Sequence, residues 1–193
     1  MDVQQEKTTL GRPRSQQAWE AVMHATQTLL RSDGYKNLSM EGIAKAAGVG
    51  KPTLYRWWPN VPSIVMEALK KQAENEIGAP NTGSLKSDLL LYLGSTCKSL
   101  SEQSGEIMRC LMAEAQFNPD FAQTFREQFI ASRRNTLIGI LKQGVLRGEL
   151  QQHADLELLA DLCYGPIWYR LLNGHLALDD DFVQALVNQI IPS

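Results

Sequence analysis

The stretch KPTLYRWW gathers several hydrogen-bond donors that suit the surface of duplex DNA. Lys51 and Arg56 can donate to guanine or to phosphate, and Thr53 can offer its hydroxyl to phosphate or its methyl group to thymine. Tyr55 and Trp57 carry a phenol O–H and an indole N–H that can reach phosphates. Each side chain alone is typical of an ordinary surface or core, so the prediction depends on their joint placement on one helix.

The two adjacent tryptophans are predicted to have different roles. Neighbouring side chains on a helix point about 100° apart, so Trp57 and Trp58 rarely fit one core together. Leu54 and Trp58 are four residues apart and are predicted to face inward. Trp57 is then expected to contact the DNA backbone, although a position in the core stays open for it.

The surrounding sequence predicts the helices that would present these side chains. A helix over Gln16–Asp33 ends at Gly34, and a second, Met40–Ala47, follows the N-cap Ser39 and ends at Gly48. A third starts near Gly50, has proline in its first turn and is closed by Pro59. Short helices joined by a glycine turn predict a helix-turn-helix, whose later helix enters the major groove.

An arginine-containing segment, GRPR, precedes the first helix. Arginines in an extended arm can reach into a narrow minor groove, and a solvated tail is the alternative for this flexible basic arm, residues 1–14. The complete set of predicted DNA contacts is Arg12, Arg14, Ser39, Gly50, Lys51, Thr53, Tyr55, Arg56 and Trp57.

The remainder of the chain is also predicted to be helical, which makes the fold class all-α. A fourth helix, 62–77, completes a helix-turn-helix domain over residues 15–77, and GAPNTGS, Gly78–Ser84, is the clearest linker. A larger C-terminal helical bundle over 85–193 follows, for about nine helices in all. Its helices are predicted at Leu85–Gln103, Gly105–Asn118, Asp120–Gly148, Asp155–Gly174 and Asp179–Ile191.

Composition excludes several classes of protein. The 193 residues contain no apolar run long enough to span a membrane and no signal-peptide core, so no membrane partner is predicted. The three cysteines lack CxxC spacing and the three histidines are isolated, so we predict no metal site and no cofactor. We find no nucleophile elbow and no glycine-rich phosphate loop, and therefore predict that the chain is not an enzyme.

Charge is distributed unevenly along the chain. Residues 1–75 hold ten Lys and Arg against seven Asp and Glu, whereas residues 76–193 hold nine against fourteen. A basic head on an acidic body favours an anionic partner, double-stranded DNA, for the head alone.

The N-terminal sequence resembles the tetracycline-repressor (TetR) family of transcriptional regulators. The match is carried by Gly34-Tyr35, by Ser39-x-x-x-Ile43-Ala44-x-x-Ala47-Gly48-Val49 and by Thr53-Leu54-Tyr55-x-Trp57-Trp58-Pro59. Trp57 stands at the family's usual histidine or tyrosine and Trp58 at its usual phenylalanine, while Val61 replaces a frequent phosphate-contacting lysine. The C-terminal sequence is similar to the dimerisation part of one branch of the family. The resemblance implies a cytoplasmic homodimer with a ligand-responsive body.

Two sets of body residues are candidates for those tasks. Stripes at helical spacing on the last two helices could pair two subunits, although such stripes are more often intramolecular core: Leu159, Cys163, Ile167, Phe182, Leu186 and Ile190. Apolar and amphipathic side chains could line a small-molecule pocket, although most will be core: Tyr92, Met112, Phe117, Phe121, Phe125 and Trp168.

These observations predict a sequence-specific transcriptional regulator. The expected mode of action is repression at a palindromic operator, relieved by a small apolar or amphipathic ligand. The alternative is a DNA-binding regulator without a small-molecule effector, controlled by a protein partner or by abundance. A closed, fully packed body would favour that alternative, and an apolar cavity would favour the sensor.

Overall fold

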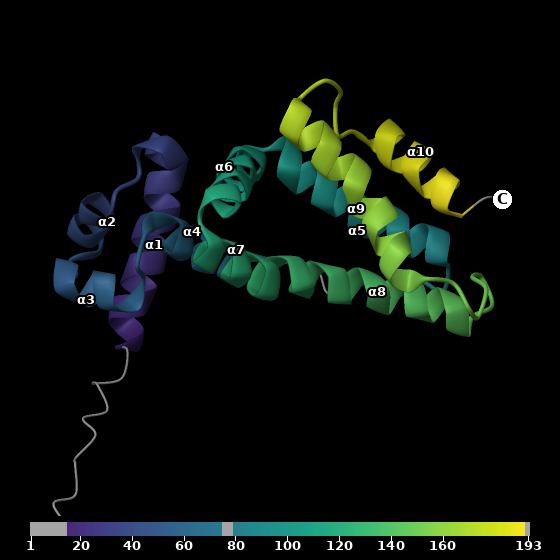
Figure 1. The fold of residues 1–193 in the computed structure, drawn as a ribbon, viewed down its shortest axis with the longest axis horizontal. Helices are drawn as coiled ribbons and strands as arrows, with labels where there is room; N and C mark the ends of the chain where they lie inside the picture. Colours follow the sequence, from purple (N-terminus) through teal and green to yellow (C-terminus); the bar gives the residue numbers. More distant parts are fainter. Residues whose placement is uncertain (1–14, 75–78, 192–193) are drawn as a thin grey trace, which may run out of the picture.

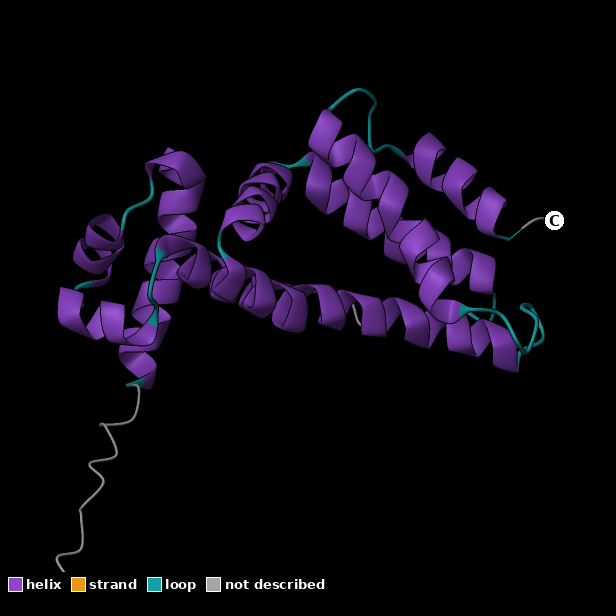
Figure 2. Cartoon of the chain, viewed as in Figure 1, coloured by secondary structure: helices purple, strands orange, loops and turns teal. Residues whose placement is uncertain are grey.

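The fold is known from a computed structural model that describes residues 15–74 and 79–191. Every regular element within these ranges is helical, which confirms the all-α prediction (Figures 1 and 2). The predicted basic arm with Arg12 and Arg14 and the end of the fourth predicted helix, 75–77, lie outside the described residues.

The N-terminal part, called the head below, consists of four helices and a short 3₁₀ turn, η1. They are α1 (Gln16–Asp33), η1 (Tyr35–Asn37), α2 (Met40–Ala47), α3 (Lys51–Trp57) and α4 (Val61–Glu74). The C-terminal part, called the body, contains α5 (Leu85–Ser101), α6 (Gln103–Phe117), α7 (Pro119–Phe125), η2 (Arg126–Ile130), α8 (Ala131–Leu146), α9 (Leu156–Asn173) and α10 (Asp180–Ile190).

Side-chain caps fix many of these helix starts. The Ser39 hydroxyl accepts the Gly42 N–H at 3.0 Å and begins α2, as its sequence position predicts. Asp155 and Asp179 accept backbone N–H groups at 3.0 and 2.9 Å and begin α9 and α10. Because capping is a local interaction, these boundaries could be read from the sequence.

One predicted helix is divided. The segment expected as a single helix over 120–148 is interrupted by η2, a five-residue π-helical segment between α7 and α8. Figure 1 shows the three pieces running on as one long rod along the base of the body. A π-helical segment accommodates an extra residue and rotates the helix face that follows it, and such insertions are frequent at functional sites.

Two hydrophobic cores meet at α4. The head core contains Ile64 of this helix together with Leu54 and Trp58, whereas the body core contains Val65 from the same helix. Leu69 packs against the body core as well. The fourth helix is therefore shared by both parts of the protein.

Predicted pairing residues on α9 and α10 pack inside the protomer. Cys163 and Ile167 are completely buried, and Phe182 and Leu186 are each 8% exposed. Leu159 and Ile190 are partly buried against the same body core. Helical periodicity identified an apolar stripe correctly, but α5, α8 and α10 of the same chain cover it. The side chains that α9 leaves exposed form another stripe: Leu158, Leu162, Tyr169 and Leu172.

Candidate functional site

The outer face of α3 presents the polar side chains predicted to contact DNA. Lys51 and Arg56 are exposed, Tyr55 is 47% exposed, and Thr53 is half-buried. They project from a seven-residue helix that is anchored from below by Leu54, which is completely buried. The short helix therefore offers several hydrogen-bond donors to one external surface.

A glycine turn sets the angle between α2 and α3. Gly48 has φ +64° and ψ 27°, the left-handed conformation that side chains with a Cβ rarely adopt, and its N–H closes the end of α2. Gly50 then caps α3 without a side chain. Ser39 is exposed at the start of α2, and its hydroxyl proton is free to donate outward because the oxygen acts as the acceptor in the cap.

The adjacent tryptophans occupy different environments. Trp58 is 2% exposed in the head core, which confirms the inward prediction for it and for Leu54. Trp57 is half-buried, and its ring lies edge-on to that of Trp58 with centroids 5.6 Å apart. A contact between Trp57 and DNA stays a prediction. Val61, at the family's lysine position, begins α4 and packs partly against both cores.

Sequence reasoning did not identify Glu67 as a connector within the head. One carboxylate oxygen of Glu67 accepts the indole N–H of Trp19, and the other accepts that of Trp58. The ammonium group of Lys71 lies 4.6 Å from the Trp19 ring centroid, within the range of a cation–π contact. A single side chain of α4 thus joins α1 to the end of α3.

Glu41 lies beside Lys51 and Tyr55, two of the predicted DNA contacts, and was itself not predicted. Its carboxylate is 3.5 Å from the Lys51 ammonium and accepts a hydrogen bond from the Tyr55 hydroxyl at 3.4 Å. A hydrogen bond with its own backbone and the charge of Lys51 hold the pKa of Glu41 below its ordinary value. Because the pair is exposed, it contributes little to stability, and its main effect is to occupy two predicted DNA contacts.

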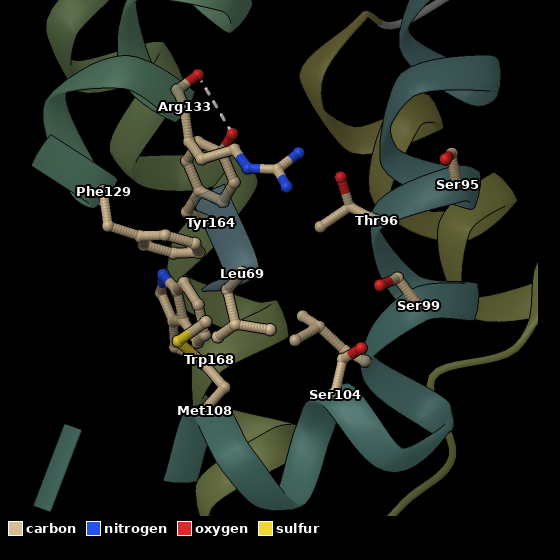
Figure 3. A pocket seen from close by; sticks show the side chains of 11 residues that line it. Leu69, Ser95, Thr96, Ser99, Ser104, Met108, Phe129, Arg133, Tyr164 and Trp168 are labelled. Carbon is tan, nitrogen blue, oxygen red and sulfur yellow. Dashed lines mark hydrogen bonds between the residues drawn. The ribbon is translucent and has the colours of Figure 1, made fainter. Parts of the chain in front are cut away.

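A pocket opens in the body beside α4. Its cavity volume is about 60 Å³, and one side of it is open to solvent. Side chains from α4, α5, α6, η2, α8 and α9 line it: Leu69, Ser95, Thr96, Ser99, Leu100, Ser104, Met108, Phe129, Arg133, Tyr164 and Trp168. Figure 3 shows Arg133 facing Thr96 at one end and Leu69, Trp168 and Met108 gathered at the other.

Of the six predicted pocket residues, Trp168 lies in this lining. Phe121 and Phe125 are buried in the body core, 3% and 5% exposed. Met112 packs partly against that core. Phe117 is 88% exposed at the end of α6, so its prediction as a pocket residue is wrong. An apolar residue at a helix end can point outward, and the sequence carries no signal for that orientation.

The sixth of these residues, Tyr92, lies behind the pocket lining, where it contacts Tyr164 and the backbone of Arg133. Its hydroxyl is 2.8 Å from that of Tyr164, and each hydroxyl is 3.2 Å from the carbonyl oxygen of Arg133. Burial, followed by the proximity of Tyr92, raises the pKa of Tyr164, so the Tyr164 phenol stays protonated. The hydroxyls therefore fix the backbone of Arg133 at the pocket edge.

No three His, Cys, Asp or Glu side chains in residues 15–74 and 79–191 come together as a metal site. Within the same ranges, none of the helices combines the length and apolar character needed to cross a bilayer.

Comparison with known proteins identifies the fold and the regulatory head. Residues 22–60 match the model of bacterial regulatory proteins of the tetR family, and residues 79–190 match that of the tetracyclin repressor-like C-terminal domain. The chain belongs to the TetR family of DNA-binding transcriptional regulators.

Relatives of known sequence or structure align along most of the chain. The HTH-type transcriptional regulator YdeS of Bacillus subtilis is 32% identical over 177 residues, covering 92% of this chain and 89% of the relative. The crystal structure of the TetR family regulator SCO0332 superimposes with a TM-score of 0.81 at 30% identity, covering 91% and 97% of the two chains.

A more distant structure shares the TetR fold alone. The transcriptional regulator FadR from Bacillus subtilis, solved in complex with stearoyl-CoA, gives a TM-score of 0.64 at 19% identity, with 90% of this chain and 98% of that one covered. The TetR-family assignment agrees with the arrangement of α2 and α3.

Proposed function

We propose that this TetR-family protein is a cytoplasmic homodimeric repressor that leaves a palindromic operator when a small amphipathic molecule occupies the body pocket. Its role would be regulatory rather than enzymatic. The observation that carries the proposal is the position of α4. Leu69 of this helix lines the pocket, while Ile64 and Glu67 of the same helix hold the head.

The link through α4 gives a physical route from ligand to DNA. A molecule that displaces Leu69 would shift α4, and with it the contacts of Glu67 to Trp19 and Trp58. Since Trp58 ends the recognition helix, that shift would alter the placement of α3. The ligand can lower DNA affinity only by as much as it prefers the shifted state.

On the DNA side, α3 and its flanks would make the contacts. We propose base contacts from Arg56 and Lys51 and backbone contacts from Ser39, Gly50, Thr53, Tyr55 and Trp57, with Arg12 and Arg14 of the arm as further candidates. One recognition helix covers one half-site, so two subunits would read half-sites about 34–36 Å apart, or a multiple of that distance.

The stripe that α9 leaves exposed is the proposed pairing surface. Leu158, Leu162 and Tyr169 are 54%, 50% and 63% exposed, and Leu172 continues the same face of the helix. Exposed apolar side chains at helical spacing are typical of a helix that packs against another chain. In sedimentation, Leu162→Glu should give a folded monomer, whereas Leu91→Glu on α5, equally exposed but off this stripe, should stay dimeric.

Ligand-responsive repression fits an open pocket better than the alternative of control by a protein partner or by abundance. A regulator of that second kind would not need a hollow beside α4. The structure of FadR, which shares this fold, was solved in complex with stearoyl-CoA, and this supports an amphipathic ligand for the proposed sensor.

Selection of genomic fragments bound by the purified chain tests the DNA half of the proposal. A palindrome should emerge, and affinity should fall steeply with salt because phosphate contacts release counterions. Arg56→Ala should cost about 1–3 kcal/mol on the best site and relax the preference at one base pair. Lys98→Ala, which removes an exposed charge from α5, serves as the control. An equal loss on all sequences would make Arg56 a phosphate contact.

A cavity-filling variant tests the ligand half. Any small molecule that releases DNA from the wild-type chain should fail to release DNA from Ser99→Phe, because the phenyl ring would occupy the pocket. Operator affinity without ligand should be unchanged. Continued release of DNA from Ser99→Phe would place the effector site elsewhere.

A further inference from the structure

The chemistry of the pocket lining indicates which class of molecule it takes, if the proposed ligand-responsive function holds. Its two ends differ. Leu69, Met108 and Trp168 form an apolar end, and Figure 3 shows the guanidinium of Arg133 reaching into the opposite end, toward Thr96. A ligand that fills both ends must therefore carry an apolar part and a polar group.

Arg133 brings a positive charge that has no acidic partner among the described residues. Its neighbour Arg134 forms ion pairs with Glu157, at 2.6 Å, and with Asp161. Arg133 instead lies over the Phe129 ring, with its guanidinium carbon 5.7 Å from the ring centroid. A half-buried guanidinium without a counter-ion attracts an anion, and its planar fork matches a carboxylate.

The surrounding structure holds Arg133 in place without any ligand. Its carbonyl oxygen accepts from the hydroxyls of Tyr92 and Tyr164. The π-helical segment η2 supplies Phe129 one turn before it, so that both side chains face the pocket. The backbone of Arg133 is thus held before any ligand binds, and the contact with the Phe129 ring limits the freedom of its guanidinium, which favours affinity.

Two serines add neutral hydrogen-bond donors to the pocket lining. Ser99 and Ser104 line the pocket, are half-buried, and have no hydrogen-bond partner for their hydroxyls among the described residues. The Thr96 hydroxyl differs, because it donates to the Tyr92 carbonyl oxygen at 3.0 Å. The pocket thus offers one cation and at least two free hydroxyl donors.

We propose that the effector is an organic monoanion with a single carboxylate on an apolar group. It places its carboxylate on Arg133 and its apolar group against Trp168 and Leu69. One cation balances one negative charge. A phosphate monoester, with nearly two charges, would leave a partly buried charge uncompensated, which costs free energy. The apolar part of the ligand is the part that would reach α4 and move that helix. The carboxylate would determine which ligands bind.

Matched probes that differ in charge alone test this inference. Decanoate, 1-decanol and decylamine form an aliphatic set, and 4-phenylbutyrate, 4-phenylbutanol and 4-phenylbutylamine form an aromatic set. Each is titrated calorimetrically into the full-length wild-type protein. In at least one set, the carboxylate should bind about 10- to 100-fold more tightly than the alcohol, the range expected for a hydrogen bond to a charged group. The set that binds more tightly shows whether the apolar part of the ligand is aliphatic or aromatic.

Variants assign that preference to Arg133. Arg133→Gln should reduce the carboxylate affinity to that of the alcohol, and Arg133→Lys should restore part of the difference, because it keeps the charge but loses the fork. Lys142→Gln also removes one positive charge from α8, but at an exposed position outside the pocket, and should bind the probes like the wild type. Circular dichroism checks that each variant is folded.

The possible failures are distinct. Equal binding of alcohol and carboxylate, or an unchanged preference in Arg133→Gln, would overturn the anion inference and leave the ligand-responsive function standing. Preference for the amine would overturn it in the same way. If no member of either set bound the wild-type protein, the pocket would not take amphipathic ligands, and both proposals would fail.

Discussion

Replacing Glu67 by glutamine should weaken the connection between α4 and the rest of the head. The carboxylate accepts two indole N–H groups, from Trp19 on one oxygen and from Trp58 on the other. An amide of the same shape has one oxygen, and its NH₂ group would face the second indole N–H, donor against donor. The side-chain volume is unchanged, so the effect isolates hydrogen bonding from packing.

The expected magnitude follows from the burial of the two donors. Trp58 is 2% exposed, so its N–H cannot turn to water, and the amide oxygen should stay with it. Trp19 is half-buried and can release its N–H to solvent. The variant then loses one charge-assisted hydrogen bond and weakens the other. We expect a loss of about 2 kcal/mol in the free energy of unfolding.

Urea denaturation followed by far-ultraviolet circular dichroism measures this loss without depending on tryptophan fluorescence. Glu20→Gln, on the exposed side of α1, is the control and should change stability by less than about 0.5 kcal/mol. In a Trp19→Phe background, Glu67→Gln should cost only about 1 kcal/mol, because one amide oxygen then suffices for Trp58. An equal cost in both backgrounds would refute the shared-carboxylate reasoning, as would an unchanged midpoint in the single variant.

Three further changes probe the DNA face, the buried ion pair and the α5–α6 turn. If α3 contacts DNA as proposed, Glu41→Gln should raise affinity for duplex DNA of any sequence severalfold at low salt, because it removes a negative charge that would lie near the phosphates. A lower affinity in band-shift assays would instead make Glu41 a base contact. Burial by itself would raise the pKa of Asp88, but hydrogen bonds from Thr82 and Arg147 outweigh it and hold that pKa below its ordinary value. The carboxylate therefore stabilises the fold above its unfolded-state pKa of about 3.9, and this contribution disappears as pH falls through the lower folded-state pKa. Asp88→Asn should lower the free energy of unfolding by about 2–3 kcal/mol at neutral pH and by progressively less in acid. Thermal denaturation of both proteins at several pH values measures this. A difference between wild type and variant that does not change with pH would contradict a stabilising role for the Asp88 carboxylate. A Cβ on Gly105 would lie 2.0 Å from the Leu100 carbonyl oxygen, so Gly105→Ala should lower the free energy of unfolding in denaturant by about 3 kcal/mol. The control Gly94→Ala has open space around the new Cβ and should be neutral or stabilising. Similar denaturation midpoints for the two variants would mean that the α5–α6 turn relaxes freely.

Several features of the head could be predicted from the sequence because local interactions determine them. The capping serine Ser39 begins α2 as expected, and Gly34 and Gly48 follow the ends of α1 and α2 as expected. The four-residue spacing of Leu54 and Trp58 identified the inward face of α3. The role of Glu67 could not be read in the same way, because its two indole partners lie 48 and 9 residues away along the chain.

In the body, the sequence determined the helices and the tertiary structure decided what each face contacts. An apolar stripe shows that a face is buried but not by which neighbour, so Cys163 and Ile167 proved to be covered by their own chain. The pocket depends on where five helices and η2 meet, and half-buried polar residues such as Ser99 and Arg133 carry no periodic signal. The single cation at its edge gains meaning only when the fold shows that Arg134 has acidic partners and Arg133 has none among the described residues. Sequence patterns record which side chains avoid water, whereas cavities and unpaired charges arise from contacts between distant segments.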